Sequence, residues 1–343
     1  MNSFPLDRFH GYMSKTFTFK STPESSISVD VIYPEETNSS PSTVLMHYHG
    51  GFLIVGDRYT FLPYWLVHAC VSRKWIFVTP DYRLMPETTA HSAIQDAKDA
   101  YAWVRSSLSG LLGRSIGAVH MAGSSAGGYL AMSTAMTAVE IPDSLLLIYG
   151  MLDPAGVRYT TPGSNIFGRS VIDTRPVFRE FPNGIKKADN KVISAYPLLG
   201  DPAQDHRLAL VSALHIEARF PDYMTGMVGL SGAIVEDGLK AVPEEHRVLF
   251  PCSFGGFAKF PRTMLLHGLN DSAVPVENSF RAAEKLREAG VLVTTEFPED
   301  AEHGFDARAG NVDVEGDEGS SVVAVESLRR AIDFLDSSGA KSQ

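Results

Sequence analysis

The chain has 343 residues, of which 44% are hydrophobic and 20% charged, and its formal net charge is −10. This length and composition suit one α/β enzyme domain with insertions and exclude a globally disordered chain. An acidic chain without a basic run is a poor candidate for binding nucleic acid or an anionic membrane.

Short apolar segments alternate with segments of helical periodicity along most of the chain. Alternating apolar and polar residues at 17–20 and 27–33 predict two antiparallel strands. The pattern then predicts, in chain order, a strand at 44–49, a helix at 60–73, a strand at 75–80, a helix at 91–108, a strand at 118–123, a helix at 126–139 and a strand at 145–150. Near the end it predicts a strand at 263–268, a helix at 276–289, a strand at 291–297 and a helix at 322–336. This order indicates an α/β fold with a mostly parallel central sheet and helices on both faces.

Residues 151–262 interrupt the alternation of strands and helices. The stretch is rich in Pro, Gly, Phe and Arg, and it is too long for a bare loop. Long insertions in compact domains are usually functional, so we expect a cap over an active site, with a packing subdomain as the alternative. Residues 36–150 and 263–343 would then form the core.

The two cysteines, Cys70 and Cys252, form neither a disulfide framework nor a zinc pattern, and they fit a reducing compartment. Residues 1–15 contain no long apolar run behind a basic start, which predicts no secretory signal. No segment has the length and apolar character of a membrane span. We therefore expect a cytoplasmic protein.

The pattern G-x-S-x-G, typical of a serine nucleophile on a sharp turn, occurs twice. One match is GRSIG around Ser115, and the other is GSSAG around Ser125. The turn requires a strand before it and a helix after it, and only Ser125 has both. Ser115 precedes the strand at 118–123 and so enters the sheet at the opposite edge. We interpret Ser125 as the nucleophile and Ser115 as a chance match.

A serine hydroxyl needs a base, and the base needs an orienting carboxylate. Asp271 and His303 each follow a predicted strand, so both lie at the carboxyl edge of the sheet, in the expected order Ser, Asp, His. Asp153 is a rival acid, which we rank lower because the strands before Asp271 and His303 are consecutive. The alternatives are a helix N-cap for Asp271 and a surface loop position for His303.

A loop after the first predicted parallel strand supplies candidate donors for an oxyanion. Gly50 and Gly51 can turn sharply and aim N–H groups at a tetrahedral oxygen, together with the N–H group of Ala126 after the nucleophile. His49 could be mistaken for the base. We expect it to steady the loop by hydrogen bonds, because His303 already fills the base role.

These residues resemble the hormone-sensitive-lipase-like branch of the α/β-hydrolases, which includes plant and microbial carboxylesterases. The resemblance is carried by HGGF at 49–52, DYRLMPE at 81–87 and GSSAGG at 123–128, and Asp271 and His303 complete it. It implies an α/β-hydrolase fold, a cap made from residues 1–35 and 151–262, no metal and no cofactor. It also implies that Arg83 is structural and that Asp81 and Glu87 support the active-site loops.

The chain departs from this family at three places. Phe52 stands where the family usually has a third glycine, and its bulk is expected to narrow or redirect the acyl pocket. The segment after MPE lacks the usual proline and double alanine, and the insertion is long for the family. These departures concern the substrate more than the catalytic machinery.

The main hypothesis is a serine hydrolase that cleaves a carboxylic ester of a small to medium apolar substrate through an acyl-enzyme on Ser125. The alternative keeps the same residues for acyl transfer, cyclisation or bond cleavage on a secondary-metabolite intermediate. A non-catalytic ligand-binding protein is a third hypothesis, which the presence of Ser125 and His303 disfavours. We expect a small-molecule ester or acyl substrate, no nucleic acid and no membrane span, and leave a homodimer, the natural substrate and the acyl length open.

Overall fold

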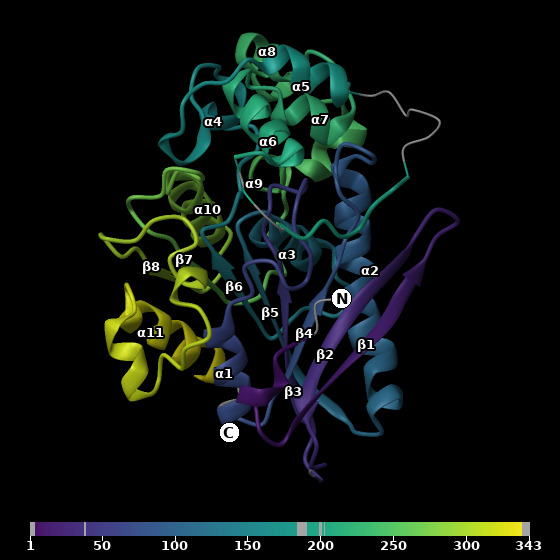
Figure 1. Ribbon diagram of the computed structural model, residues 1–343, viewed down its shortest axis with the longest axis vertical. Coiled ribbons are helices and arrows are strands. Elements are labelled where there is room, and N and C mark those ends of the chain that lie inside the picture. Colours follow the sequence, from purple (N-terminus) through teal and green to yellow (C-terminus); the bar gives the residue numbers. More distant parts are fainter. Residues whose placement is uncertain (1–3, 38, 184–190, 199–200, 202, 338–343) are drawn as a thin grey trace.

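The computed structural model describes residues 4–37, 39–183, 191–198, 201 and 203–337, which include an eight-stranded sheet in the order β1-β2-β4-β3-β5-β6-β7-β8 (Figure 1). The strands are β1 (Tyr12–Ser21), β2 (Ser26–Pro34), β3 (Ser42–Tyr48), β4 (Ile76–Pro80), β5 (Ile116–Ser124), β6 (Ser144–Ile148), β7 (Thr263–Leu266) and β8 (Val293–Glu296). β2 pairs antiparallel with β1 and β4, and the other neighbours pair in parallel. The predicted mostly parallel sheet is confirmed.

Helices cover both faces of the sheet, as predicted. The covering helices are α1 (Tyr64–Ser72), α2 (Ala90–Leu112), α3 (Ala126–Thr137), α10 (Glu277–Glu288) and α11 (Val325–Asp336). Side chains alternate between the two faces along a strand. On β3, Val44 and Met46 therefore belong to one apolar cluster with α2, α3 and α10, whereas Leu45 belongs to a second cluster with α1 and α11.

Two predicted helices begin later than their apolar periodicity indicated. The helix expected at 60–73 begins at Tyr64, because Pro63 lies at its N-cap. The helix expected at 322–336 begins at Val325, after Ala324 in a left-handed conformation. Val323, which lies within the predicted range, is therefore outside the helix and is 49% exposed.

Residues 12–34 form a long antiparallel hairpin at one edge of the sheet (Figure 1). β2 pairs with β4 over Val29–Ile32, and the side chains of Val29, Val31 and Ile32 are fully buried. The predicted strands are confirmed, but the assignment of residues 1–35 to a cap is wrong for residues 12–34. Pairing with β4 buries their apolar face in the sheet.

The described part of residues 151–262 forms helices and connecting loops that gather at one end of the molecule (Figure 1). Its helices are α4 (Val157–Thr160), α5 (Thr174–Glu180), α6 (His206–Ile216), α7 (Phe220–Thr225), α8 (Leu230–Asp237) and α9 (Pro251–Phe254), with the 3-10 helices η2 (Ile166–Gly168), η3 (Gly238–Ala241) and η4 (Glu244–Leu249). The remaining 3-10 helices are η1 (Leu6–Arg8), η5 (Ala307–Ala309) and η6 (Asp317–Ser321). Among the described residues, we find no helix with the length and apolar character needed to cross a membrane.

Candidate active site

Ser125 lies in a sharp turn between β5 and α3. Its φ of 56° and ψ of −120° are rare for a residue with a side chain, and such strain is common at functional sites. The Ser125 N–H group donates to Ile148 O at 2.9 Å, and Ser125 O accepts from the Met151 N–H group at 3.0 Å. Both backbone polar groups of Ser125 are therefore hydrogen-bonded to the last residue of β6 and to the segment that follows it.

The two matches to G-x-S-x-G lie at opposite ends of β5. A Cβ atom on Gly127 would lie only 1.9 Å from Tyr48 O, so the turn at Ser125 requires glycine there. Ser115 is exposed and follows Gly113, the left-handed C-cap of α2. Nine strand residues separate the two serines, which corresponds to roughly 30 Å. Of the two, the structure brings only Ser125 to the predicted acid and base.

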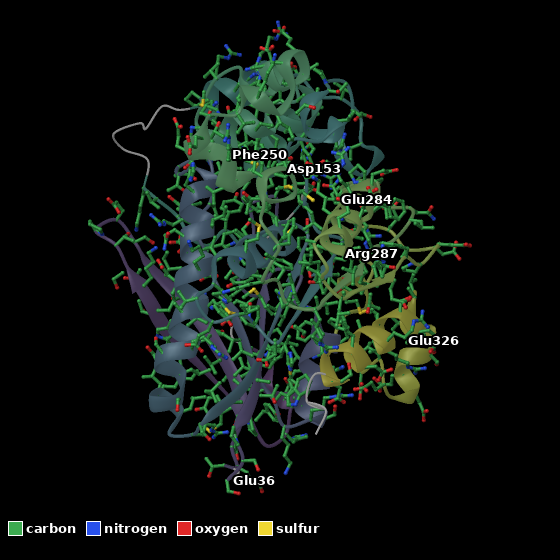
Figure 2. The ribbon with its side chains drawn as sticks, turned by 180° about the vertical axis from the view of Figure 1, so that it is seen from behind. Glu36, Asp153, Phe250, Glu284, Arg287 and Glu326 are labelled. Carbon is green, nitrogen blue, oxygen red and sulfur yellow. The ribbon has the colours of Figure 1, made fainter. Side chains whose placement is uncertain are left out.

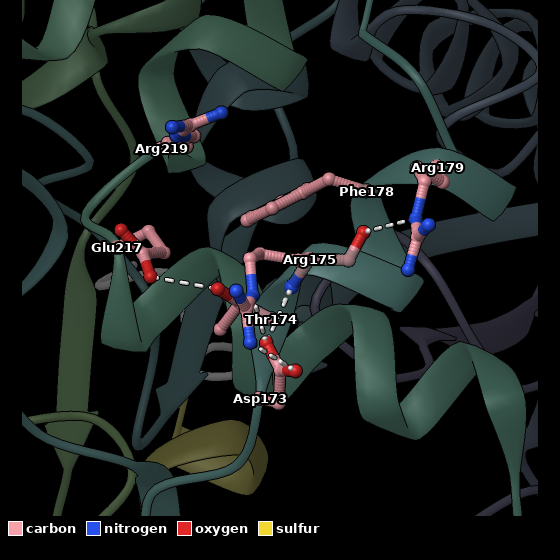
Figure 3. Close-up of a pocket in the computed structure, with 7 residues that line it drawn as sticks. All are labelled: Asp173, Thr174, Arg175, Phe178, Arg179, Glu217 and Arg219. Carbon is pink, nitrogen blue, oxygen red and sulfur yellow. Dashed lines mark hydrogen bonds and ion pairs between the residues drawn. The ribbon is translucent and has the colours of Figure 1, made fainter.

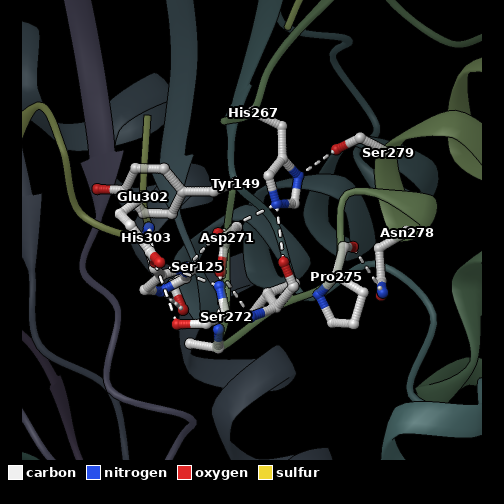
Figure 4. Close-up of polar contacts among 12 residues, drawn as sticks. Ser125, Tyr149, His267, Asp271, Ser272, Pro275, Asn278, Ser279, Glu302 and His303 are labelled. Atoms are coloured by element: carbon white, nitrogen blue, oxygen red, sulfur yellow. Dashed lines mark hydrogen bonds and ion pairs between the residues drawn. The ribbon is translucent and has the colours of Figure 1, made fainter. Parts of the chain in front are cut away.

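Ser125, His303 and Asp271 form a hydrogen-bonded chain (Figure 4). Ser125 Oγ lies 3.0 Å from His303 Nε2, and His303 Nδ1 lies 2.6 Å from Asp271 Oδ2. The carboxylate can only accept, so Nδ1 carries the proton and Nε2 accepts from the serine hydroxyl. All three side chains are almost fully buried. This arrangement can move a proton from the hydroxyl to the imidazole and stabilise the cation that forms.

The Asp271 carboxylate is held by four donors. Oδ1 accepts from the N–H groups of Ala273 and Val274 at 2.9 and 2.8 Å, and Oδ2 accepts from His303 and, at 3.1 Å, from His267 Nε2. Burial alone would raise the pKa of Asp271, but the electrostatic attraction and the hydrogen bonds of His303 and His267 favour the ionised carboxylate and outweigh it. The pKa therefore lies well below its usual range, and the carboxylate is ionised at neutral pH.

His267 is a fully buried residue that the sequence analysis did not single out. Its Nε2 contacts two acceptors, Asp271 Oδ2 and Val274 O, and its Nδ1 lies 2.8 Å from Ser279 Oγ (Figure 4). These partners fix the ring and aim its N–H group at the carboxylate. The available signal was its place in LLHGLND, four residues before Asp271.

Replacement of His267 by leucine is expected to lower kcat by about 10- to 100-fold, the effect of losing a hydrogen bond to a charged group. KM should change little, because His267 does not line the cavity at Ser125. His267→Gln, which keeps an N–H donor, should recover part of kcat. Ester hydrolysis and thermal unfolding of both variants test this, and a leucine variant with wild-type kcat would contradict it.

Aromatic rings surround the His303 imidazole. The Tyr149 ring centroid lies 4.5 Å from it, the Phe167 ring 5.9 Å and the Phe52 ring 6.4 Å. The Tyr149 hydroxyl in turn donates to the buried carboxylate of Asp306 at 2.5 Å. These contacts restrict the orientation of the imidazole from several sides, and they exclude water from most of the ring.

The backbone of Gly50 and Gly51 lies against the serine. A Cβ atom on Gly50 would lie 3.1 Å from Ser125 Cβ, and Gly51 has a φ of 109°, which favours glycine. Within the described part of the chain, no hydrogen bond involves the N–H groups of Gly50, Gly51 or Ala126 as donors. Unused N–H groups beside the Ser125 hydroxyl can stabilise a negative oxygen. The structure thus groups all three predicted oxyanion donors around Ser125.

His49 is buried and turned toward its own loop. Its ring stacks on Tyr82 at 4.2 Å, and Nδ1 lies 2.7 Å from Gly50 O. Burial lowers the pKa of His49 to about 4, so the ring is neutral at pH 7 and donates from Nδ1 to Gly50. These contacts agree with a role in holding the glycine loop.

The charged residues of the motif at 81–87 form ion pairs beneath this loop. Asp81 pairs with Arg58 at 2.5 Å, and Arg83 contacts both carboxylate oxygens of Asp96 at 2.8 Å. The Asp81 and Asp96 carboxylates are buried, so each pair ties the segment to its neighbours through a carboxylate shielded from solvent.

Glu87 of the same motif is joined to the insertion by Arg207 of α6. Arg207 is 5% exposed, and two of its nitrogens lie 2.7 and 3.0 Å from the Glu87 carboxylate. Its Nε donates to Ile54 O at 2.8 Å, and Nη2 also donates to Met85 O. One buried side chain thus connects the insertion to the loop that follows Gly51.

A cavity of about 600 Å³, within the range of small-molecule sites, opens above Ser125 and His303. The core lines it with Gly50, Gly51, Phe52, Val55, Phe61, Ser124, Ser125, Tyr149, His303, Gly304, Ala307 and Arg308, and the insertion with Ile166, Phe167, Arg169, Leu198 and Leu208. Phe52 contributes its ring to this wall and packs edge-on against His215 at 4.8 Å. The lining is mostly apolar.

Another hollow, of about 740 Å³, lies on the insertion away from these residues (Figure 3). Several of its polar side chains contact one another: Arg175 pairs with Asp173 at 2.9 Å, and the Thr174 hydroxyl donates to Glu217 at 2.7 Å. None of the predicted site residues lines it. Its size alone therefore does not make it a candidate active site.

The rival acid Asp153, labelled in Figure 2, lies where the insertion begins and lines a hollow that does not include His303. Its carboxylate pairs with Arg281 of α10, and its N–H group donates to Asn278 Oδ1 at 3.0 Å. Among the described residues, no group of three or more His, Cys, Asp or Glu side chains is arranged to hold a metal ion.

Family models match the two parts of the chain that carry these residues. A model described as the α/β hydrolase fold matches residues 45–215, and a model of the prolyl oligopeptidase family matches residues 244–318. Ser125 and the glycine loop lie in the first range, and Asp271 and His303 lie in the second.

Several curated relatives align over most of the chain, and they include a carboxylesterase and polyketide synthases. The chain is 25% identical over 322 residues to probable carboxylesterase M8 from Phoma sp., which covers 87% of this chain and 91% of that protein. It is 28% identical over 313 residues to non-reducing polyketide synthase pkbA from Emericella nidulans, over 81% of this chain. The chain spans only 12% of the length of that synthase.

Solved structures share the fold. A bacterial heroin esterase has a TM-score of 0.64 at 18% identity, with 96% of this chain and 85% of that chain covered. Carboxyl esterase 2 from Tuber melanosporum has a TM-score of 0.58 at 18% identity, with the same coverage of both chains. At this identity the structures support the arrangement of the sheet and helices, and the predicted fold is confirmed.

Proposed function

Since the chain belongs to the α/β-hydrolase family, we propose that it is a serine hydrolase that cleaves the carboxylic ester of a small to medium apolar substrate. The observation that carries this proposal is the hydrogen-bonded chain from Ser125 through His303 to Asp271, at the floor of an apolar cavity. The similarity to a probable carboxylesterase over most of both chains supports it.

In this mechanism Ser125 Oγ attacks the acyl carbon of the ester while His303 Nε2 takes the hydroxyl proton. Asp271 holds the Nδ1–H tautomer and balances the imidazolium charge. The N–H groups of Gly50, Gly51 and Ala126 donate to the oxyanion. The imidazolium then protonates the leaving alcohol, and water activated by the same base releases the acid from the acyl-enzyme.

We propose that residues 151–262 act as a cap that selects the substrate. Ile166, Phe167, Leu198 and Leu208 contribute apolar side chains to the cavity wall, which supports this role. The apolar wall favours a hydrophobic acyl or alcohol group, and the cavity volume favours a small molecule over a polymer.

The test is to incubate the wild type, Ser125→Ala and Ser115→Ala with a fluorophosphonate probe and a chain-length series of para-nitrophenyl esters. We expect labelling and turnover by the wild type and Ser115→Ala, and neither by Ser125→Ala. A wild type that is neither labelled nor active would sink the proposal. Labelling that persists in Ser125→Ala and disappears in Ser115→Ala would reverse the choice of serine.

A second candidate function uses the same residues for acyl transfer, cyclisation or bond cleavage on a secondary-metabolite intermediate. The similarity to non-reducing polyketide synthases over 81% of the chain favours it, although the chain spans a small part of those proteins. It differs from hydrolysis in the fate of the acyl group. Labelling of Ser125 with negligible ester hydrolysis, and transfer to an added alcohol in preference to water, would select this candidate.

A further inference from the structure

The charges at the mouth of the candidate active-site cavity are of one sign. Apart from His303, the charged residues among the described cavity lining are Arg169 and Arg308, and no Asp or Glu lines it. The whole chain, in contrast, carries a formal net charge of −10. The lining itself therefore carries two arginines and no carboxylate, so the solvent-facing charge of the cavity wall is positive and attracts anions from solution.

The two arginines reach the cavity from different parts of the chain. Arg308 lies on η5, five residues after His303. Arg169 directly follows η2 in the insertion, and its guanidinium carbon lies 5.6 Å from the centroid of the Phe167 ring. The Phe167 ring itself lies 5.9 Å from the His303 ring. The core and the insertion each therefore contribute one arginine to the wall of the cavity that contains Ser125.

Neither guanidinium group forms an ion pair or a hydrogen bond within the described residues. Other arginines nearby are engaged, such as Arg207 with Glu87 and Arg281 with Asp153. Arg169 and Arg308 are both exposed, so their donors are available to a ligand without breaking an internal pair. A guanidinium group presents its donors in a planar fork that matches a carboxylate.

We propose that the substrate is an apolar ester that also carries a carboxylate, which Arg169 and Arg308 bind at the cavity mouth while the ester bond lies at Ser125. This inference rests on the proposed function, because it names the substrate class of the same site. The apolar wall formed by Phe52, Phe61 and Phe167 takes the body of the molecule. The two arginines supply the charge that discriminates an anionic ester from a neutral one of the same size.

Matched substrates test this inference. One pair is para-hexanoyloxybenzoate and para-hexanoyloxybenzamide, which differ only in a carboxylate or carboxamide on the alcohol side. The other is the para-nitrophenyl monoester of adipic acid and that of adipamic acid, which place the same difference on the acyl side. Both pairs are assayed with the wild type, Arg169→Gln, Arg308→Gln and the double variant. Arg179→Gln is the control, since Arg179 is an exposed arginine that lines the separate hollow.

In at least one pair, the wild type should show a kcat/KM about 10-fold higher for the carboxylate, as expected for a charge-assisted contact at a partly solvated site. The double variant should bring the ratio of kcat/KM for the carboxylate to kcat/KM for the carboxamide to about one, while Arg179→Gln should keep the wild-type ratio. Salt should weaken the preference, because exposed charges are screened. Equal kcat/KM values within both pairs, or a preference that survives in the double variant, would overturn the inference.

A binding measurement separates this inference from the proposed function. If the wild type hydrolyses neutral esters but ignores the carboxylate, the proposed function stands and the inference fails. If the wild type hydrolyses neither, calorimetric titration of Ser125→Ala with the two hexanoyloxy compounds decides the inference by itself. Tighter binding of the carboxylate that requires Arg169 and Arg308 would support it, and equal or undetectable binding of both compounds would overturn it.

Discussion

Replacement of Asp271 by asparagine is expected to lower kcat by about 10⁴-fold. Asp271 Oδ2 accepts from His303 Nδ1 at 2.6 Å, and a carboxylate accepts only. An asparagine amide in this place can donate to Nδ1 instead, which leaves the proton on Nε2, where the ring can no longer accept from Ser125. The geometry survives this change, but the tautomer is wrong for catalysis. Steady-state hydrolysis of a para-nitrophenyl ester measures the loss.

Asp153→Asn is the matched control, because Asp153 was the rival acid and is also buried. Its carboxylate pairs with Arg281, so the substitution should leave kcat within a few-fold of the wild type. A large loss of kcat in Asp153→Asn with a normal Asp271→Asn would reverse the assignment.

Because the pKa of Asp271 is lowered in the folded protein, the free energy of unfolding depends on pH. A carboxyl group whose pKa is lower in the folded state stabilises the fold above its unfolded pKa of about 3.9. That contribution is lost as the pH falls through the folded pKa. The difference in unfolding free energy between wild type and Asp271→Asn should therefore be largest near neutral pH and should shrink in acid.

Replacement of Arg207 by methionine is expected to lower the free energy of unfolding by about 3–5 kcal/mol, the usual effect of removing one partner from a buried ion pair. Glu87, whose side chain is 10% exposed, would be left without its partner, and Ile54 O and Met85 O would lose a donor. Ile54 belongs to the turn that follows Gly51, so kcat should fall as well. Urea denaturation and ester hydrolysis measure the two effects.

Two variants show whether the effect comes from the buried pair. Arg207→Met combined with Glu87→Leu should recover part of the stability, because no charge is then buried alone. Arg175→Met removes the exposed pair with Asp173 and should leave the denaturation midpoint unchanged. If Arg207→Met and Arg175→Met denature alike, the insertion is not held to the core through Arg207.

The sheet could be predicted from the sequence because its strands carry local signals. Continuous apolar runs such as SLLLI of β6 become strands that are buried on both faces. Parallel strands also share one carboxyl edge, so the loops after β5, β7 and β8 had to meet. The meeting of Ser125, Asp271 and His303 followed from that topology without any distance information.

The rest of the site depends on contacts that no local pattern records. Arg169 and Phe167 reach the cavity through the packing of the insertion, whose short helices lack a long apolar period. His267 and Arg207 act through partners that only tertiary structure brings near, although His267 lies four residues from Asp271. The hairpin at 12–34 was correctly predicted as strands, but pairing with β4 rather than sequence position decided where it lies.

The wall of the cavity is formed by two parts of the chain, the core and the insertion at residues 151–262. The proposed nucleophile Ser125 and base His303 lie on loops that follow strands of the sheet, whereas Ile166, Phe167, Arg169, Leu198 and Leu208 come from helices and loops inserted between β6 and β7. Substitutions in the insertion can therefore reshape what the cavity accepts while the bond-breaking groups keep their positions. Mutations confined to the insertion can thus change the substrate range during evolution. The insertion can also be exchanged by design, provided that the replacement carries an arginine that pairs with Glu87.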